Sequence, residues 1–233
     1  MYDRTINLRS QTTTRWASLP YVLPFAVFLA LLAQQKYAPL SPYIEFTVRD
    51  VLLAIVLFLV SRRVTELRSM RRLETVIIGV AVFVVWVAPD VVLPNYRQHW
   101  LFQNFITGQI STTIPEDIIR SPIVLWPRII QAVVLVPILE ELFWRAWLMR
   151  WLINPRFESV PLGTYQAASF WITAVLFASE HGPYWDVGLI AGIAYNWWMV
   201  RTRSLGDCIL AHAITNACLC GYVVATHHWE YWQ

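Results

Sequence analysis

Two acidic residues and one arginine stand in an otherwise apolar run at residues 129–145, where Glu140, Glu141 and Arg145 interrupt the hydrophobic sequence. At the centre of a membrane helix each of them costs roughly 2.5 to 3.5 kcal/mol, so we expect these side chains to face the protein interior and to pair. Glu141 and Arg145 are four residues apart and can form an ion pair on one helix face. Glu140 then points about 100° away from Glu141 and has no obvious partner on its own helix.

Glu140 fits the description of a general base. A carboxyl group that is desolvated beside a second acid can accept and donate protons during a reaction. The alternative interpretation is structural, with both acids serving as helix-packing ion pairs or lying at the membrane boundary.

Two histidines and an asparagine follow on later apolar runs. Phe177 and His181 are four residues apart at the end of one run, and His212 and Asn216 have the same spacing within the last run. A lone histidine near the end of a span is more often structural than functional, but the combination with Glu140 favours one shared site. Counting about 1.5 Å per helical residue from the cytoplasmic end of each span places His181 deeper than the other groups, but helix tilt and the span boundaries still allow all four to share one layer.

Two chemistries suit this set of side chains. In the first, a carboxylate activates water, a histidine helps to hold that water, and polar donors stabilise the tetrahedral oxyanion of a peptide bond under attack. In the second, Glu140, His181 and His212 bind a divalent ion such as zinc, which acidifies a bound water. The sequence lacks an H-E-x-x-H helix, which disfavours a zincin site. Both chemistries predict a hydrolase.

The composition requires a bilayer around these residues. Of 233 residues, 57% are hydrophobic and 14% are charged, and the mean hydropathy is +0.47. These values exceed what a soluble core needs, so we predict an all-α polytopic bundle of about seven spans, with six to eight as the range and the site inside the bundle. The expected spans are 19–33, 46–60, 75–88, 123–151, 165–180, 186–200 and 205–225.

Arginines cluster beside these spans and predict how the chain is oriented. With seven alternating spans, all four basic regions fall on one side, which the positive-inside rule makes cytoplasmic together with the N-terminus. The net charge of +3 comes from these clusters, so we expect membrane lipid and no nucleic acid as a partner. We divide the chain into N-terminal spans with an outer linker, 1–122, and a catalytic core, 123–233. The basic regions are 4–15, 62–72, 150–156 and 201–203.

Three short motifs in this order resemble those of the CAAX protease and bacteriocin-processing (CPBP) intramembrane endopeptidases. The resemblance covers residues 128–225, and the N-terminal spans match only in hydrophobicity. The three motifs are Glu140-Glu141-x-x-x-Arg145, Phe177-x-x-x-His181 and His212-x-x-x-Asn216.

The resemblance implies an α-helical intramembrane endopeptidase. It implies that Glu140 and His181 manage the water, that His212 and Asn216 form the oxyanion hole, and that the ion pair of the first motif supports them. The substrate is then a protein or peptide at the membrane, either lipid-modified or carrying a leader or a sorting signal. The chain also resembles a bacterial subgroup linked to exosortase and PEP-CTERM sorting, which implies a location in the bacterial inner membrane.

Two positions depart from the motif pattern or extend it. Ala146 stands where the family often has glycine, which concerns helix packing and not chemistry. Glu180, beside His181, either orients the imidazole or lies at the outer boundary of its span.

Two other classes of function are alternatives to a protease for a chain of this kind. A membrane scaffold or partner-binding protein would keep the same helical core without turnover. A transporter would also place ionisable groups inside the membrane, but the sequence has no repeated halves or paired broken helices to support it.

Overall fold

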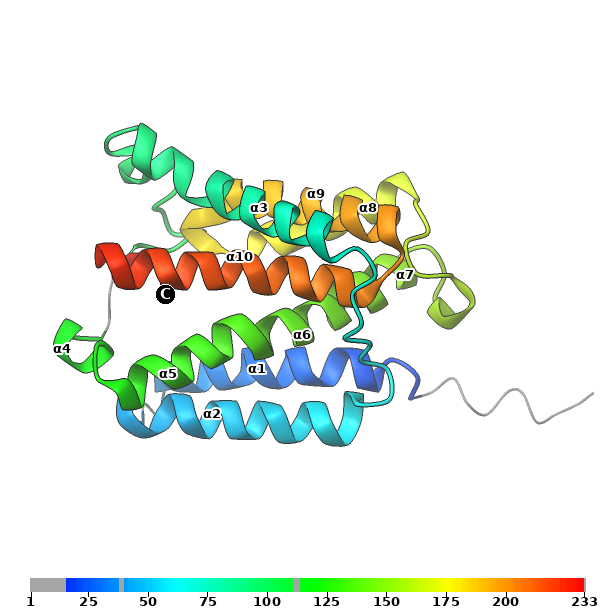
Figure 1. Cartoon of the computed structure of the whole chain (residues 1–233), viewed down its shortest axis with the longest axis horizontal. Helices are drawn as coiled ribbons and strands as arrows, with labels where there is room; N and C mark the ends of the chain where they lie inside the picture. Colours follow the sequence, from blue (N-terminus) through cyan, green and yellow to red (C-terminus); the bar gives the residue numbers. More distant parts are fainter. Residues whose placement is uncertain (1–15, 38–39, 111–113, 233) are drawn as a thin grey trace, which may run out of the picture.

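Helices that run along a common direction make up the structure, a computed structural model that describes residues 16–37, 40–110 and 114–232 (Figure 1). Within these residues the only β-structure is an isolated bridge between Asn104 and Gly108. The prediction of an all-α bundle is therefore confirmed.

The N-terminal part supplies three long helices. Helix α1 (Leu19–Tyr37) and helix α2 (Pro42–Val56) form an antiparallel pair, and α2 continues into a π-helical turn, Leu57–Ser61. Proline at the first position of α2 suits a helix start because it lacks only an N–H that would have no partner in the helix. Helix α3 (Arg72–Val92) lies on the opposite side of the molecule, against α10.

One continuous helical stretch crosses the molecule at residues 122–151 and carries the first motif. Pro137 lies within it and lacks the N–H that would bond to the carbonyl of Val133 in a regular α-helix. The π-helical turns before and after the two glutamates widen the helix, a feature that is frequent at functional sites. The stretch consists of α5 (Pro122–Ile130), a π-segment (Gln131–Leu135), α6 (Val136–Glu141), a second π-segment (Leu142–Leu148) and α7 (Met149–Trp151).

The C-terminal part places one helix at the centre of the bundle. Helices α8 (Ala167–Ser179) and α9 (Trp185–Thr202) form an antiparallel pair. Helix α10 (Leu205–Thr226) packs against α3, α6 and α9, so it touches both halves of the molecule (Figure 1). The side chain of Ser204 accepts a hydrogen bond from the N–H of Asp207 and caps the start of α10.

Glycine permits the closest approach between these helices. A Cβ atom added at Gly79 in α3 would lie 2.6 Å from the carbonyl oxygen of Ala211 in α10. A Cβ atom at Gly192 in α9 would lie 3.1 Å from the carbonyl oxygen of Ala174 in α8. Small residues at these crossings therefore let the backbones pack tightly around the centre of the bundle.

Each of the seven predicted spans contains a helix, but the helices differ in how well they suit a membrane. Three stretches are long and apolar enough to cross a bilayer by length and composition: α3, residues 122–151 and α10. Two further helices, α1 and α8, are apolar but shorter. The chain therefore has the helices of an integral membrane protein, and the number of spans stays a prediction.

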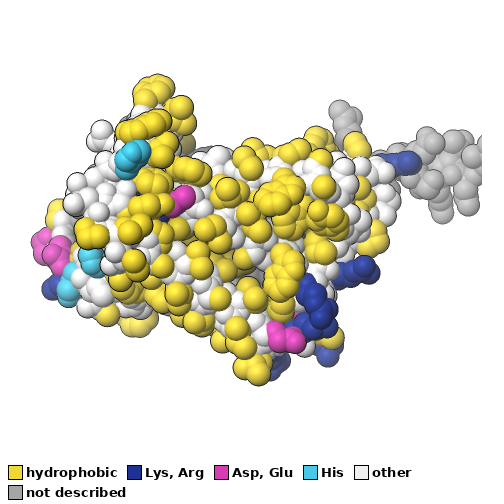
Figure 2. Space-filling view, turned by 90° about the horizontal axis from the view of Figure 1, so that it is seen from above, with side chains coloured by type: hydrophobic (Ala, Val, Ile, Leu, Met, Phe, Trp, Pro, Cys, Tyr) yellow, Lys and Arg dark blue, Asp and Glu magenta, His cyan; other side chains and the backbone are white. Residues whose placement is uncertain are grey.

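Basic side chains gather at one end of the bundle. The linkers after α2, α7 and α9 lie at the same end as the start of α1 (Figure 1). Arginine side chains collect at that end, while hydrophobic side chains cover the flank (Figure 2). This arrangement agrees with the predicted one-sided distribution of arginines. Assignment of that end to the cytoplasm stays a prediction.

Candidate active site

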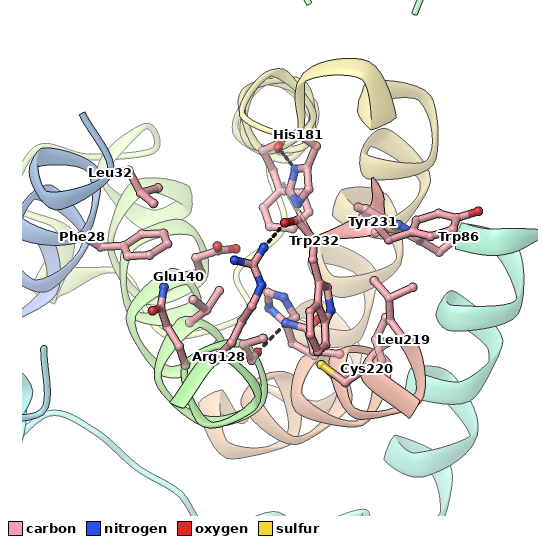
Figure 3. Close-up of a pocket in the computed structure, with 18 of the residues that line it drawn as sticks. Phe28, Leu32, Trp86, Arg128, Glu140, His181, Leu219, Cys220, Tyr231 and Trp232 are labelled. Carbon is pink, nitrogen blue, oxygen red and sulfur yellow. Dashed lines mark hydrogen bonds between the residues drawn. The ribbon is translucent and has the colours of Figure 1, made fainter. Parts of the chain in front are cut away.

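Glu140 lies at the wall of a cavity between the helices, open on one side. The cavity has a volume of about 250 Å³ and is lined by the four residues predicted from the three motifs, Glu140, His181, His212 and Asn216. Figure 3 shows Glu140 and His181 on its wall. The Glu140 side chain is buried, with 6% of the residue exposed, and its Oε2 atom has no hydrogen-bond partner among the described residues. The fold thus brings these groups from α6, the end of α8 and α10 to one space, with an unengaged carboxylate oxygen at its wall.

The neighbouring carboxylate of Glu141 is held away from this space. Its Oε1 atom accepts hydrogen bonds from Nη1 of Arg145 at 3.0 Å and from Nδ1 of His212 at 2.9 Å. Glu141 and Arg145 are completely buried, and they form the predicted ion pair. Adjacent residues on a helix face different directions, so one acid is committed to structure while the other borders the cavity.

Arg145 is fixed by further contacts that join three helical elements. Its Nε donates to Oδ1 of Asn196 at 3.1 Å, and its guanidinium lies 4.4 Å from the ring centre of Phe177. Nδ2 of Asn196 in turn donates to the carbonyl of Phe170 at 2.8 Å. A buried guanidinium with hydrogen bonds and an aromatic face holds the second π-segment, α8 and α9 in one arrangement.

The imidazole of His181, which lines the cavity, has one ring nitrogen bound to the backbone and one left free. Its Nδ1 lies 2.7 Å from the carbonyl oxygen of Phe177. Because a carbonyl only accepts, Nδ1 carries the hydrogen and Nε2 of the neutral ring is an acceptor. Trp86 packs edge-on against the ring at 5.2 Å, and a Cβ atom at Gly188 would lie 3.2 Å from Cβ and Cγ of His181. The ring is therefore enclosed, with an acceptor that suits a water hydrogen.

His212 and Asn216 lie one turn apart on α10. Nδ1 of His212 donates to Glu141, so Nε2 can donate to a substrate oxygen only when the ring is an imidazolium, whose charge the carboxylate offsets. Nδ2 of Asn216 donates to the carbonyl of Ala132 at 2.8 Å, which leaves one amide hydrogen for another acceptor. Ala132 belongs to the first π-segment, so the widened helix positions the amide.

Two residues that support the site were not predicted from the sequence. Tyr195 stacks on the imidazole of His212 with ring centres 5.0 Å apart, and its hydroxyl donates to Oγ1 of Thr215 at 2.8 Å. Asn196 accepts from Arg145. The only sequence signal for the pair is a polar Tyr-Asn step within the apolar run of α9, which does not reveal the contacts.

Glu180 has a different partner from His181. Its Oε1 atom accepts a hydrogen bond from Nε1 of Trp144 at 3.1 Å. Among the described residues no hydrogen bond joins Glu180 to the imidazole, and Glu180 does not line the cavity. The structure therefore gives no support for an orienting role.

A metal ion does not fit these side chains as they are placed. Among the described residues no group of three His, Cys, Asp or Glu side chains is arranged to hold a metal ion. Glu140, His181 and His212 border one cavity without converging on one point, so we derive no step through zinc.

Comparison with known proteins gives one match. Residues 122–218 match the family model described as type II CAAX prenyl endopeptidase Rce1-like. The matched segment contains all three motifs and leaves α1, α2 and α3 outside it. No curated protein and no solved structure matches the chain significantly.

Proposed function

Residues 122–218 make this chain a member of the Rce1-like CAAX endopeptidase family. From this premise we propose that Glu140 activates the water molecule with which the protein cleaves its substrate. Membership of this family identifies a protease of the CAAX type. The long apolar helices suggest that the protease is an integral membrane protein.

The proposed reaction begins with a water molecule between Glu140 and His181. Glu140 accepts a proton from the water while Nε2 of His181 accepts its second hydrogen, and the oxygen attacks the carbonyl carbon of the peptide bond. The C–N bond of the tetrahedral intermediate then breaks, and the proton held by Glu140 passes to the departing amine. The products are a carboxylic acid and an amine.

The intermediate carries a negative oxygen that needs donors. The free amide hydrogen of Asn216 supplies one donor from α10, and Nε2 of His212 supplies a second whenever that nitrogen carries a hydrogen. Glu141 and Arg145 hold His212 in place and do not touch the substrate. We expect Asn216→Ala to lower kcat by about 10²- to 10³-fold, the usual effect of losing one oxyanion donor.

One observation supports this proposal most strongly. Glu140 lines the cavity and accepts no hydrogen bond from the described residues, whereas Glu141 lies off the cavity and its Oε1 atom accepts from Arg145 and His212, with only its Oε2 atom unpartnered. The test replaces the wild-type protein in its host by Glu140→Ala and identifies membrane peptides that accumulate by mass spectrometry. Uncleaved precursors with one common tail support the proposal, and identical peptide profiles contradict it.

The same experiment addresses the substrate. We propose a protein tail that is lipid-modified or carries a sorting signal, cleaved at the inner membrane of a bacterium. The apolar cavity wall suits such a tail, because it includes Phe28, Leu32 and Phe46. The mass of each accumulated tail shows whether a lipid is attached.

Hydrolysis without a metal is the version of the mechanism that we propose, because the candidate ligands do not converge. We expect a strong chelator to leave the cleavage rate of the purified protein unchanged. A loss of activity that added zinc restores would favour the metal-bound alternative.

A further inference from the structure

The C-terminal residues of the chain enter the same cavity as Glu140. His227 adopts a left-handed backbone conformation, with φ of 62°, and ends α10. The chain then forms a 3-10 turn, Trp229–Tyr231, and Tyr231 and Trp232 line the cavity (Figure 3).

Side chains at the end of α3 and between α3 and α5 hold this segment in place. Nε1 of Trp229 donates to Glu116 at 3.1 Å, and the hydroxyl of Tyr231 donates to Asp90 at 2.8 Å. The Trp229 ring also packs in a small apolar cluster with Ile119 of α4 (Glu116–Ile119). These contacts direct Trp232 inward.

Arg128 receives Trp232 inside the cavity. Its guanidinium donates to the carbonyl oxygen of Trp232 and lies 5.3 Å from the indole ring centre (Figure 3). The same guanidinium lies 5.0 Å from the ring centre of Phe46. Among the described residues no carboxylate lies within ion-pair distance of Arg128. The contacts are a peptide carbonyl and two aromatic faces, which is how a guanidinium binds an aromatic residue of a peptide.

Gln131 adds an acceptor one turn further along the helical stretch. Gln131 is 8% exposed and lines the cavity, and its Oε1 atom has no hydrogen-bond partner among the described residues. A buried amide oxygen without a partner costs free energy, and a peptide N–H would satisfy it. Arg128 as donor and Gln131 as acceptor thus complement the two polar groups of a peptide backbone.

We propose that Arg128, Gln131 and Phe46 form a subsite for an aromatic residue of a bound peptide, and that Trp232 fills this subsite as an intramolecular competitor. That the displaced ligand is a protease substrate rests on the proposed function. The subsite itself does not depend on catalysis. A tethered residue competes at an effective concentration in the millimolar range, so an incoming peptide must bind well or the tail must first leave.

The test is a binding measurement in the Glu140→Gln background, so that no turnover is needed. The probe is a fluorescent, C-terminally amidated peptide that copies residues 227–232, added to protein in lipid nanodiscs. We expect Trp232→Ala to bind the probe at least about tenfold more tightly than the parent, because the competitor is gone. Adding Arg128→Gln to Trp232→Ala should abolish that gain. Trp100→Ala, which removes an exposed indole between α3 and α4, serves as the control and should match the parent.

A second measurement covers the case in which Trp232→Ala fails to fold. Carboxypeptidase should trim the C-terminus of Arg128→Gln about tenfold faster than that of the wild type, with the exposed Arg201→Gln as the control. Equal probe binding by parent and Trp232→Ala, or equal trimming of Arg128→Gln and wild type, overturns the subsite. Absence of cleavage by the wild type with intact probe binding would instead count against the proposed function alone.

Discussion

Two adjacent glutamates have different roles in this molecule because neighbouring side chains on a helix point about 100° apart. Glu141 is surrounded by Arg145 and His212, and Glu140 borders the cavity. The distinction was predictable from the i,i+4 spacing of Glu141 and Arg145, which leaves Glu140 without a partner. The hydrogen bond from His212 to Glu141 was not, because it joins residues 71 positions apart.

Substituting glutamine for Glu141 should therefore lower the stability of the protein, whereas the same substitution at Glu140 should not. Glu141→Gln leaves the buried Arg145 without its counter-charge, and we expect a loss of about 3 to 5 kcal/mol in the free energy of unfolding. Glu140→Gln breaks no ion pair and should not lower it. Thermal or denaturant unfolding in detergent measures both, and equal stability of the two variants would contradict these assignments.

At the scale of the elements, the helical stretches could be predicted from hydrophobicity, whereas the local geometry could not. The run at 123–151 predicted a helix, and the structure interrupts it with two π-segments around α6. A hydropathy pattern does not contain the backbone hydrogen-bond register of a helix, which is what distinguishes these turns from α-helix. The entry of Trp232 into the cavity is likewise absent from such a pattern.

Pro137 links this geometry to activity. Pro137→Ala restores an N–H that can bond to Val133, so the first π-segment should tighten and move the carbonyl of Ala132 away from Asn216. We expect kcat to fall by about 10²-fold, as small misplacements of catalytic groups do, without loss of thermal stability. Unchanged kcat would show that the π-segment does not position the amide.

Close packing of α3 on α10 gives a test at the same scale. A Cβ atom at Gly79 would lie 2.6 Å from a backbone oxygen, so Gly79→Ala should lower the free energy of unfolding by about 1 to 3 kcal/mol. Gly221→Ala, where nothing lies within 4 Å of the added atom, is the matched control. Equal destabilisation by both substitutions would contradict this packing.

At the scale of the whole molecule, the arginine-rich end of the bundle predicts how the protein is oriented in the membrane. The linkers after α2, α7 and α9 lie at one end, and the end of α3 and helix α4, which hold Tyr231 and Trp229, lie at the other (Figure 1). We expect single cysteines at Arg156 and Arg201 to be labelled from the cytoplasm, and one at Trp100 from outside. Labelling of all three from one side would contradict the predicted orientation.

The central claim is that Glu140 activates the water in the cavity. Its most direct test is the single-turnover cleavage rate of purified Glu140→Gln, compared with Glu74→Gln at the exposed start of α3. General-base catalysis contributes about 10²- to 10⁴-fold, so we predict that Glu140→Gln loses at least 10²-fold in rate while Glu74→Gln retains the wild-type rate. Wild-type cleavage by folded Glu140→Gln would contradict the account.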